Sequence, residues 1–217
     1  AFVTVTRHTL SERSIFMEKI DILSLSPETL GQYLAEMGEP KFRAKQLFSW
    51  LHQKQVTDFA QMTTLSLQLR QKLNEKFCIN RLNIARKLAS SADDTVKYLY
   101  ELPDGNFVET VLMDYHHGKS LCISTQVGCR MGCQFCASTI AGYVRDLQPS
   151  ELLLQIYETQ RDAGCRIDSI VLMGIGEPLD NFDEVMRFLE NITSPEGVNI
   201  GMRNISLSTC GLVPKID

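Results

Sequence analysis

The sequence predicts an α/β protein in three successive parts: an N-terminal helical domain, a short antiparallel β meander, and the first part of a (β/α) partial TIM barrel. Three observations predict this class. Apolar residues recur at helical spacing up to about residue 80, alternate with a period of two over the next 40 residues, and then fall into alternating strand and helix patterns. At 217 residues and 44% hydrophobic composition, the chain can bury the core of one or two domains.

The two ends of the chain lack regular patterns. Residues 1–16 have no clear periodicity, and we interpret them as a non-native or disordered leader, with Met17 as the natural start. The last residues, 211–217, stop without a closing element. We therefore expect this chain to be a fragment.

Three helices are expected between residues 17 and 80. Ser26 is a candidate N-cap and Pro27 a candidate first residue of a helix that ends at Gly38. A second helix is expected over 41–54 and a third over 66–77. The second helix should turn four apolar side chains inward: Phe42, Leu47, Trp50 and Leu51. The third carries Leu67, Leu69, Leu73 and Phe77 as its apolar residues.

Charge is unevenly distributed along the chain. The net charge is only −4, which argues weakly against a nucleic-acid binder, but residues 41–87 carry ten basic and two acidic side chains, a net +8. A basic block beside an acidic half is typical of a module that faces a polyanion. The alternative is a solvated helical surface. If the block binds a polyanion, we expect phosphate contacts from Lys41, Arg43, Lys45, Arg70 and Lys72.

Residues 81–118 are predicted to form the antiparallel meander. Strands are expected over 98–101, 106–113 and 119–125, with a weaker one near 83–89, because turn residues separate these segments. His116 and His117 are expected in an exposed turn.

Residues 119–217 are predicted to form an incomplete barrel core. A helix over Pro149–Ala163, a strand over 169–173, a helix over 183–192 and a strand over 204–208 follow the strand that ends near residue 125. In such barrels the chemistry lies at the carboxyl ends of the strands. Three candidate motifs follow three strands here, so we expect them to converge on one face.

The first motif contains Cys129, Cys133 and Cys136, spaced C-x3-C-x2-C. Soft thiolates select iron–sulfur clusters, zinc or Cu(I). Zinc usually takes four protein ligands, and no fourth ligand is evident near this loop. Three thiolates on a four-iron cubane leave one iron open to a substrate. The alternative is a chance cluster of cysteines or a zinc loop.

The second and third motifs are Gly174-Ile-Gly-Glu-Pro178 and Ser208-Thr-Cys-Gly211. Glycines let the backbone approach a ligand, Pro178 fixes the turn, and a carboxylate at Glu177 can accept hydrogen bonds from an ammonium group. Glu177 could instead cap the next helix, and Ser208 could be the N-cap of a helix before Leu212.

These motifs resemble known families. The cysteine spacing, with Phe135 before the last cysteine, resembles the radical S-adenosylmethionine (radical SAM) superfamily. The match extends to the dual-specificity RNA adenine-C2 methyltransferases, which methylate 23S rRNA and tRNA. It is carried by four segments: Glu109-Thr-Val, Leu121-Cys-Ile-Ser-Thr-Gln-Val-Gly-Cys129, Met173-Gly-Ile-Gly-Glu-Pro-Leu179 and Leu207-Ser-Thr-Cys-Gly-Leu-Val-Pro214.

The resemblance, which runs from about residue 17 to residue 217, implies cofactors and partners. It implies a 4Fe-4S cluster on Cys129, Cys133 and Cys136, and SAM bound by Gly176, Glu177 and Ser208. It also implies rRNA and tRNA as partners, residues 17–80 as an accessory RNA-binding domain, and an electron donor such as flavodoxin. Seven cysteines without a signal peptide, and no apolar run of about 20 residues, favour a cytoplasmic protein without membrane spans.

The family's reaction, carried over by resemblance, uses two SAM molecules and a methyl-cysteine expected beyond residue 217. Cys122 aligns with the cysteine that releases methylated RNA by forming a disulfide, and Glu109 with the proton acceptor. Cys122 could instead be a small buried hydrophobe. A carboxylate on an apolar strand face would suit general-base work, but both faces of the strand around Glu109 are apolar, so which face is buried stays open.

Two alternative functions remain. One is a radical SAM methyltransferase that acts at adenine C8, as resistance-conferring relatives do. The other is a non-catalytic RNA-binding module stabilised by zinc or a cluster.

Overall fold

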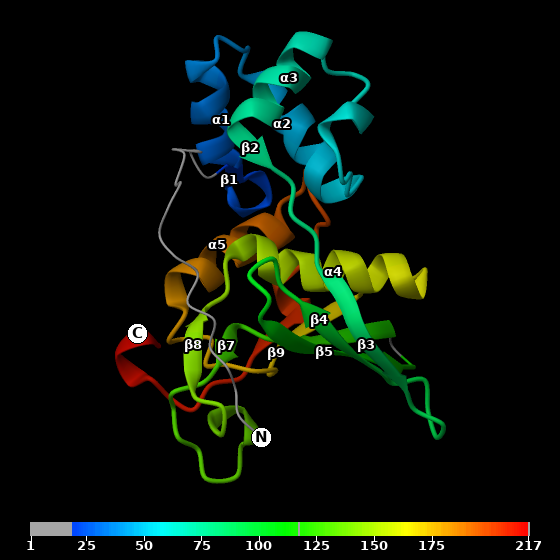
Figure 1. Ribbon diagram of the computed structural model, residues 1–217, viewed down its shortest axis with the longest axis vertical. Helices are drawn as coiled ribbons and strands as arrows, with labels where there is room; N and C mark the ends of the chain where they lie inside the picture. Colours follow the sequence, from blue (N-terminus) through cyan, green and yellow to red (C-terminus); the bar gives the residue numbers. More distant parts are fainter. Residues whose placement is uncertain (1–18, 117, 217) are drawn as a thin grey trace, which may run out of the picture.

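The computed structural model describes residues 19–116 and 118–216, in which a helical lobe lies over two long helices and a mixed sheet (Figure 1). The expected leader and start at Met17 lie outside the described residues. The lobe contains η1 (Ile22–Ser24), α1 (Pro27–Glu36), α2 (Phe42–Phe48), η2 (Ser49–Gln53), η3 (Phe59–Gln61) and α3 (Leu67–Lys76), with the short parallel strands β1 (Ile20–Asp21) and β2 (Phe77–Cys78).

Helix caps in the lobe follow from the sequence. The Ser26 side chain accepts a hydrogen bond from the Thr29 amide at 3.2 Å, and Pro27 opens α1. The Ser66 side chain accepts one from the Leu69 amide at 3.2 Å at the start of α3. The first and third expected helices are therefore confirmed.

The second expected helix is correct in extent but not in form. α2 ends at Phe48 and continues as the π-helical turn η2, so the hydrogen-bond period changes within the predicted segment. The prediction that Phe42 faces inward is wrong: 60% of Phe42 is exposed, as is 63% of the apolar Leu67. Both residues lie in the first turn of their helices, whose buried residues come later.

Six strands form one sheet in the order β10-β9-β6-β5-β4-β3. β3 (Asn83–Ala89), β4 (Val96–Glu101), β5 (Phe107–Tyr115) and β6 (Gly118–Ile123) are antiparallel neighbours, whereas β6, β9 (Ser169–Leu172) and β10 (Ile205–Leu207) are parallel. The meander and the barrel strands thus share β6. The expected boundary at residue 118 falls at the start of that strand, and the division into domains stays a prediction.

Helices α4 (Pro149–Ala163) and α5 (Phe182–Thr193) lie between the lobe and the sheet (Figure 1). A capping box between Gln148 and Glu151 begins α4, and Gly164, at φ 62°, ends it. The buried Thr110 of β5 donates a hydrogen bond to Gln155 of α4 at 2.8 Å. The face of β5 that carries Thr110 is therefore the covered one, and Glu109 faces the opposite side.

A buried polar contact joins the lobe to α4. His52 in η2 is fully buried, and its Nδ1 lies 2.8 Å from the hydroxyl of Tyr157. Burial lowers the pKa of His52 to about 3, so the ring is neutral at physiological pH. At the edge of this contact, Arg81 donates two hydrogen bonds to Glu158, at 3.0 and 3.1 Å.

One hairpin was not predicted. β7 (Gln126–Gly128) and β8 (Tyr143–Asp146) pair antiparallel and bracket the cysteine loop. His116 is exposed, as expected, and His117 lies outside the described residues. In the part of the chain that the structure describes, no helix is both long enough and apolar enough to cross a membrane.

Candidate active site

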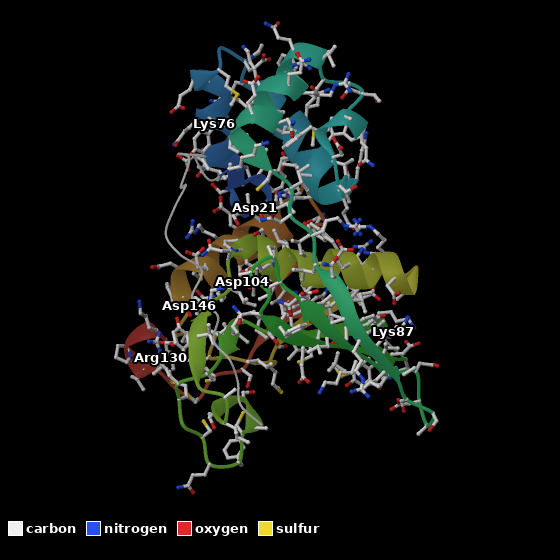
Figure 2. All side chains as sticks on the ribbon, viewed as in Figure 1. Asp21, Lys76, Lys87, Asp104, Arg130 and Asp146 are labelled. Carbon is white, nitrogen blue, oxygen red and sulfur yellow. The ribbon has the colours of Figure 1, made fainter. Side chains whose placement is uncertain are left out.

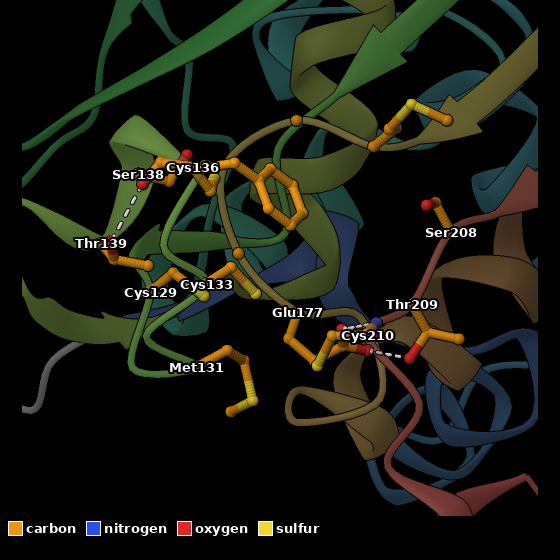
Figure 3. A pocket seen from close by; sticks show the side chains of 14 residues that line it. Cys129, Met131, Cys133, Cys136, Ser138, Thr139, Glu177, Ser208, Thr209 and Cys210 are labelled. Carbon is orange, nitrogen blue, oxygen red and sulfur yellow. Dashed lines mark hydrogen bonds between the residues drawn. The ribbon is translucent and has the colours of Figure 1, made fainter.

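The three motifs converge on one open cavity of about 180 Å³ beside the carboxyl ends of β6, β9 and β10 (Figure 3). The cysteine loop forms one wall, and the segments after β9 and β10 form the other. The structure therefore brings together the predicted site residues from all three motifs: Cys129, Cys133, Cys136, Gly176, Glu177 and Ser208.

The β7–β8 hairpin fixes the base of the cysteine loop. Gly128 has φ 71°, and a Cβ there would lie 1.8 Å from the carbonyl oxygen of Gly142, so only glycine fits. The Cys129 amide donates to the same Gly142 oxygen at 3.2 Å. Farther along, the Cys136 amide donates to the Cys133 carbonyl at 3.0 Å, so the loop turns between these two cysteines.

The three loop cysteines line one wall of the cavity. Cys129, Cys133 and Cys136 are free thiols and form no disulfide. No group of three or more His, Cys, Asp or Glu residues in the described ranges could hold one metal ion. Iron–sulfur clusters are held by cysteine thiolates, and three free thiols on one wall of the cavity fit that donor set.

The loop after β9 packs directly on the end of β6. A Cβ at Gly174 would lie 2.7 Å from the backbone of Ile123, and one at Gly176, where φ is 107°, would lie 2.6 Å from Gln126. The Glu177 amide also donates to the Gln126 side chain at 2.9 Å. The two glycines thus allow the close contact that sets Glu177 at the cavity.

The Glu177 carboxylate is buried and accepts three hydrogen bonds. They come from the Thr209 hydroxyl at 2.7 Å, the Cys210 amide at 2.7 Å and the Leu179 amide at 3.0 Å. Burial opposes ionisation, but these hydrogen bonds outweigh it and lower the pKa of Glu177 below its ordinary value. Glu177 therefore does not cap α5; it joins the loops after β9 and β10, and an ionised carboxylate keeps about one further acceptor position.

The loop after β10 supplies Ser208 and two residues that sequence reasoning missed. Ser208 lines the cavity and is not a helix N-cap, because the following 3₁₀ turn, Val213–Lys215, begins after Leu212. Thr209 and Cys210 line the cavity too. Burial and the neighbouring Glu177 carboxylate raise the pKa of Cys210 to about 11, so its thiol is protonated at neutral pH. Thr209 and Cys210 belong to the Ser208-Thr-Cys-Gly211 motif, and this motif was the sequence signal that could have identified them as site residues.

Ionic contacts tie the cysteine hairpin to the loop after β9. Arg130, which follows Cys129, donates to Asp180 at 2.7 Å and lies 4.1 Å from the ring centroid of Tyr143. The Gln126 amide bridges Asp180 and Asp146, at 2.8 Å from each. Figure 2 labels Arg130 and Asp146 at this edge of the molecule. Sequence reasoning missed these hydrogen bonds because they join residues 20 to 54 positions apart that no local pattern relates.

Cys122 and Glu109 are not among the residues that line the cavity; both lie on the face of the sheet opposite α4, here called the uncovered face. Cys122 pairs with Val111 of β5 and Val171 of β9. Burial raises the pKa of the Cys122 thiol, and the Met173 amide partly offsets this. The structure answers which face of β5 is buried: Glu109 lies on the less buried face, where its Oε1 is 2.7 Å from Lys97 Nζ and 42% of its side chain is exposed.

Several basic residues expected to face phosphates have partners within the chain. Lys45 pairs with Glu196 at 2.9 Å, Arg43 donates to Gln46 at 2.6 Å, and Arg70 donates to the Ala60 carbonyl at 2.8 Å. Their phosphate contacts stay a prediction.

Two family models match the chain. Residues 20–79 match the ribosomal RNA large subunit methyltransferase N-terminal domain, and residues 123–217 match the radical SAM superfamily. A crystal structure of a radical SAM methyltransferase from Sphaerobacter thermophilus superposes with a TM-score of 0.82 at 36% identity, over 91% of this chain and 59% of that chain. The predicted fold class, an α/β protein with a radical SAM partial barrel, is confirmed.

Curated relatives match over nearly the whole chain. A probable dual-specificity RNA methyltransferase RlmN from Lachnoclostridium phytofermentans is 53% identical over 199 residues, which are 92% of this chain and 56% of the relative. One of the same description from Alkaliphilus oremlandii is 54% identical over 200 residues, 92% of this chain and 58% of the relative. The chain therefore spans a little over half the length of these relatives.

Proposed function

This chain belongs to the radical SAM dual-specificity RNA methyltransferases of the RlmN family, and we propose that the whole protein transfers a methyl group to C2 of adenine in 23S rRNA and tRNA through a methyl-cysteine intermediate. The observation that carries the proposal is the single cavity shared by three free thiols and the buried Glu177 carboxylate. Cytoplasmic location and an electron donor such as flavodoxin are part of the proposal.

The cysteine loop would hold a 4Fe-4S cluster. Cys129, Cys133 and Cys136 would each bind one iron and leave the fourth for SAM. When bound, the cluster supplies the electron that cleaves SAM to a radical able to remove hydrogen from a methyl group. The protein's own task is to keep the three thiolates on one wall and to shield the cavity.

The opposite wall would hold SAM. Glu177 is ionised and keeps an acceptor position, which suits the SAM ammonium group, and Gly176 and Ser208 line the same space. Thr209 and Cys210 hold this carboxylate in place before SAM arrives. A pre-oriented carboxylate loses little freedom on binding, which favours affinity.

Two residues on the uncovered face of the sheet would act after SAM has been cleaved. Glu109 would take the proton from adenine C2, and Cys122 would form a disulfide with the methyl-carrying cysteine and so release the RNA. Only a thiolate can attack sulfur, so the raised pKa of Cys122 requires that it lose its proton near the moment of attack.

Nucleoside analysis tests the proposal. The full-length protein, loaded anaerobically with cluster and supplied with SAM, a reductant and RNA, should yield 2-methyladenosine. Isolation of 8-methyladenosine would show instead that the protein methylates adenine at C8. RNA binding without SAM cleavage by a cluster-loaded protein would favour the non-catalytic module.

A further inference from the structure

The two walls of the active-site cavity are joined through one buried side chain, that of Gln126. Gln126 lies in β7, at the start of the cysteine hairpin, and is fully buried. Its Oε1 accepts a hydrogen bond from the Glu177 amide at 2.9 Å, and its Nε2 donates to Asp146 Oδ1 and Asp180 Oδ2, both at 2.8 Å. A glutamine side chain has one acceptor oxygen and two N–H donors, so its oxygen and both N–H groups are engaged.

The contacts of Gln126 continue to the wall that carries the thiols. Asp180, in the loop after β9, also accepts a hydrogen bond from Arg130 Nε at 2.7 Å. Arg130 follows Cys129 directly in the chain. Hydrogen bonds thus run from the Glu177 wall through Gln126 and Asp180 to the start of the cysteine loop. Figure 3 shows the cysteine loop and Glu177 on opposite sides of the cavity.

The loop after β9 has other attachments besides Gln126. The Asn181 side chain donates to the Thr125 and Leu147 carbonyls, at 2.9 Å each. The Thr125 amide also donates to the Ile175 carbonyl at 2.8 Å. These bonds hold the loop in its path, so the Gln126 side chain can be altered without removing every attachment of the loop.

The position of Gln126 suits an amide better than any charged group of the same size. Two carboxylates, those of Asp146 and Asp180, receive its donors, and one backbone amide receives its acceptor. A glutamate here would keep the acceptor, lose both donors and bring a third carboxylate against the other two. A buried polar group that loses its partner costs more than a typical hydrogen bond contributes. Glutamate should therefore push the Asp146 and Asp180 segments apart.

We propose that Gln126 is a positioning residue that sets the spacing of the two cavity walls for SAM, acting through Asp180 and Arg130. The inference rests on the proposed function, in which SAM reaches both the cluster on the cysteine loop and the Glu177 carboxylate. Gln126 is not among the residues that line the cavity, so it acts on SAM only through its neighbours. A ligand that contacts both walls binds well only when they stand at the distance that it spans, and a misplacement of about 1 Å can cost about 10²-fold in such sites.

Affinity and the number of binding sites separate a positioning role from a structural one. A residue that only stabilises the fold changes how many molecules are folded, and those that fold bind SAM with normal affinity. A positioning residue changes the affinity of every site. Calorimetric titration of the cluster-loaded protein with SAM gives both the dissociation constant and the number of sites per molecule.

The test compares Gln126→Glu in the full-length protein with Gln155→Glu as a matched control. Gln155 is also fully buried, but it bonds to the Thr110 hydroxyl and the Ser124 backbone and so holds α4 on the sheet. Gln126→Glu should retain its iron and sulfide and bind SAM about tenfold more weakly at an unchanged number of sites. Gln155→Glu should lower the unfolding midpoint and leave the affinity of the folded molecules for SAM unchanged.

Two further variants sharpen the test. Arg130→Met removes the last contact of the path, at a side chain that is 50% exposed and whose ion pair therefore contributes little to folding. It should weaken SAM binding without altering the unfolding midpoint, so the test stands even where Gln126→Glu fails to fold. Asp146→Asn, added to Gln126→Glu, restores one donor–acceptor pair and should recover part of the lost affinity.

Normal SAM affinity in Arg130→Met and in the folded fraction of Gln126→Glu would overturn the positioning role of Gln126. A loss of sites at normal affinity would overturn it too, because that is the result expected of a purely structural residue. Failure of the unmodified, cluster-loaded protein to bind SAM would instead refute the proposed function, so the two failures are distinguishable.

Discussion

At the scale of single residues, the same cavity holds side chains with different proposed tasks. Cys133 and Glu177 stand on opposite walls, and Cys122 lies on the adjoining sheet face. Because these tasks fall at different stages of the reaction, single substitutions should fail in different ways.

Cys133→Ala should prevent assembly of a complete cluster, because one of three thiolates is lost. Iron and sulfide content after anaerobic reconstitution measures this, and the brown colour of the protein should fade with them. Cys165→Ala is the control, since Cys165 is free but lies outside the cavity. A Cys133→Ala protein with full iron and sulfide would exclude the proposed ligand set.

Glu177→Ala should weaken SAM binding and lower 5′-deoxyadenosine production in the full-length enzyme, because the ionised acceptor is gone. The substitution also frees the Thr209 hydroxyl and the Cys210 amide. Thr209→Val separates the two effects: it removes one donor but keeps the carboxylate, so SAM affinity should fall less than in Glu177→Ala. Equal losses in both variants would mean that Glu177 acts mainly on the loop after β10.

Cys122→Ala should trap RNA on the protein as a shifted band in a denaturing gel, while SAM cleavage continues. The raised pKa of the thiol adds a pH signature: in the unmodified enzyme, release of RNA should accelerate as pH rises, because more thiolate forms. If Cys122 is only a packing residue, the variant should lose on the order of 1 kcal/mol of stability and trap nothing. A cluster-loaded variant that still turns over would remove Cys122 from the mechanism.

At the scale of elements, α1, α3 and α4 were predictable because each combines a periodic apolar face with an N-terminal signal in the sequence, either a serine N-cap or a proline at the first helical position. The β7–β8 hairpin was not, because β7 has only three residues and its pairing is fixed by tertiary contacts such as Gln126 to Asp146. The exposure of Phe42 shows a further limit: helical spacing identifies a face but not where its packing begins.

The contact between η2 and α4 should make folding sensitive to acid. His52 has a pKa of about 3 when folded, against an ordinary value near 6.5, so the unfolded state binds more protons between these values. The stabilisation is complete above pH 6.5 and is lost as pH falls toward 3, by up to about 1.4 kcal/mol per pH unit. Denaturant unfolding from pH 7 to 4 measures it.

His52→Gln provides the comparison, because an amide can still bond to the Tyr157 hydroxyl but does not titrate. Its stability should fall less steeply between pH 6.5 and 4 than that of the unmodified protein. Parallel curves for the two proteins would show that His52 does not contribute to the acid sensitivity.

At the scale of the whole molecule, much of the candidate site followed from one topological rule. Segments after parallel strands meet at one edge of a sheet, so the cysteine, Glu177 and Ser208 motifs could be expected together. The Lys97–Glu109 pair could not, because its position depends on which face of β5 packs on α4. Both faces are apolar in sequence, and only the packed helix decides between them.

The basic lobe remains the part whose role depends on a partner. Lys45, Arg43 and Arg70 are engaged within the chain, whereas no ion pair in the described part of the molecule involves Lys41 or Lys72. Release of counterions from phosphate contacts makes RNA affinity fall with salt, by about 0.7–0.9 in logarithmic slope for each contact. Lys41 and Lys72 are therefore the residues whose loss should change that slope most.

The full-length Lys41→Gln, Lys72→Gln double variant should bind RNA more weakly, with a slope of log affinity against log salt reduced by about 1 to 2. Lys45→Gln is the matched control, because its ammonium already pairs with Glu196 and so should contribute less to the slope. Affinity measured from low to moderate salt decides between the two interpretations of the lobe. An unchanged slope in the double variant would mean that these lysines form only a solvated surface, and that RNA contacts lie elsewhere in the protein.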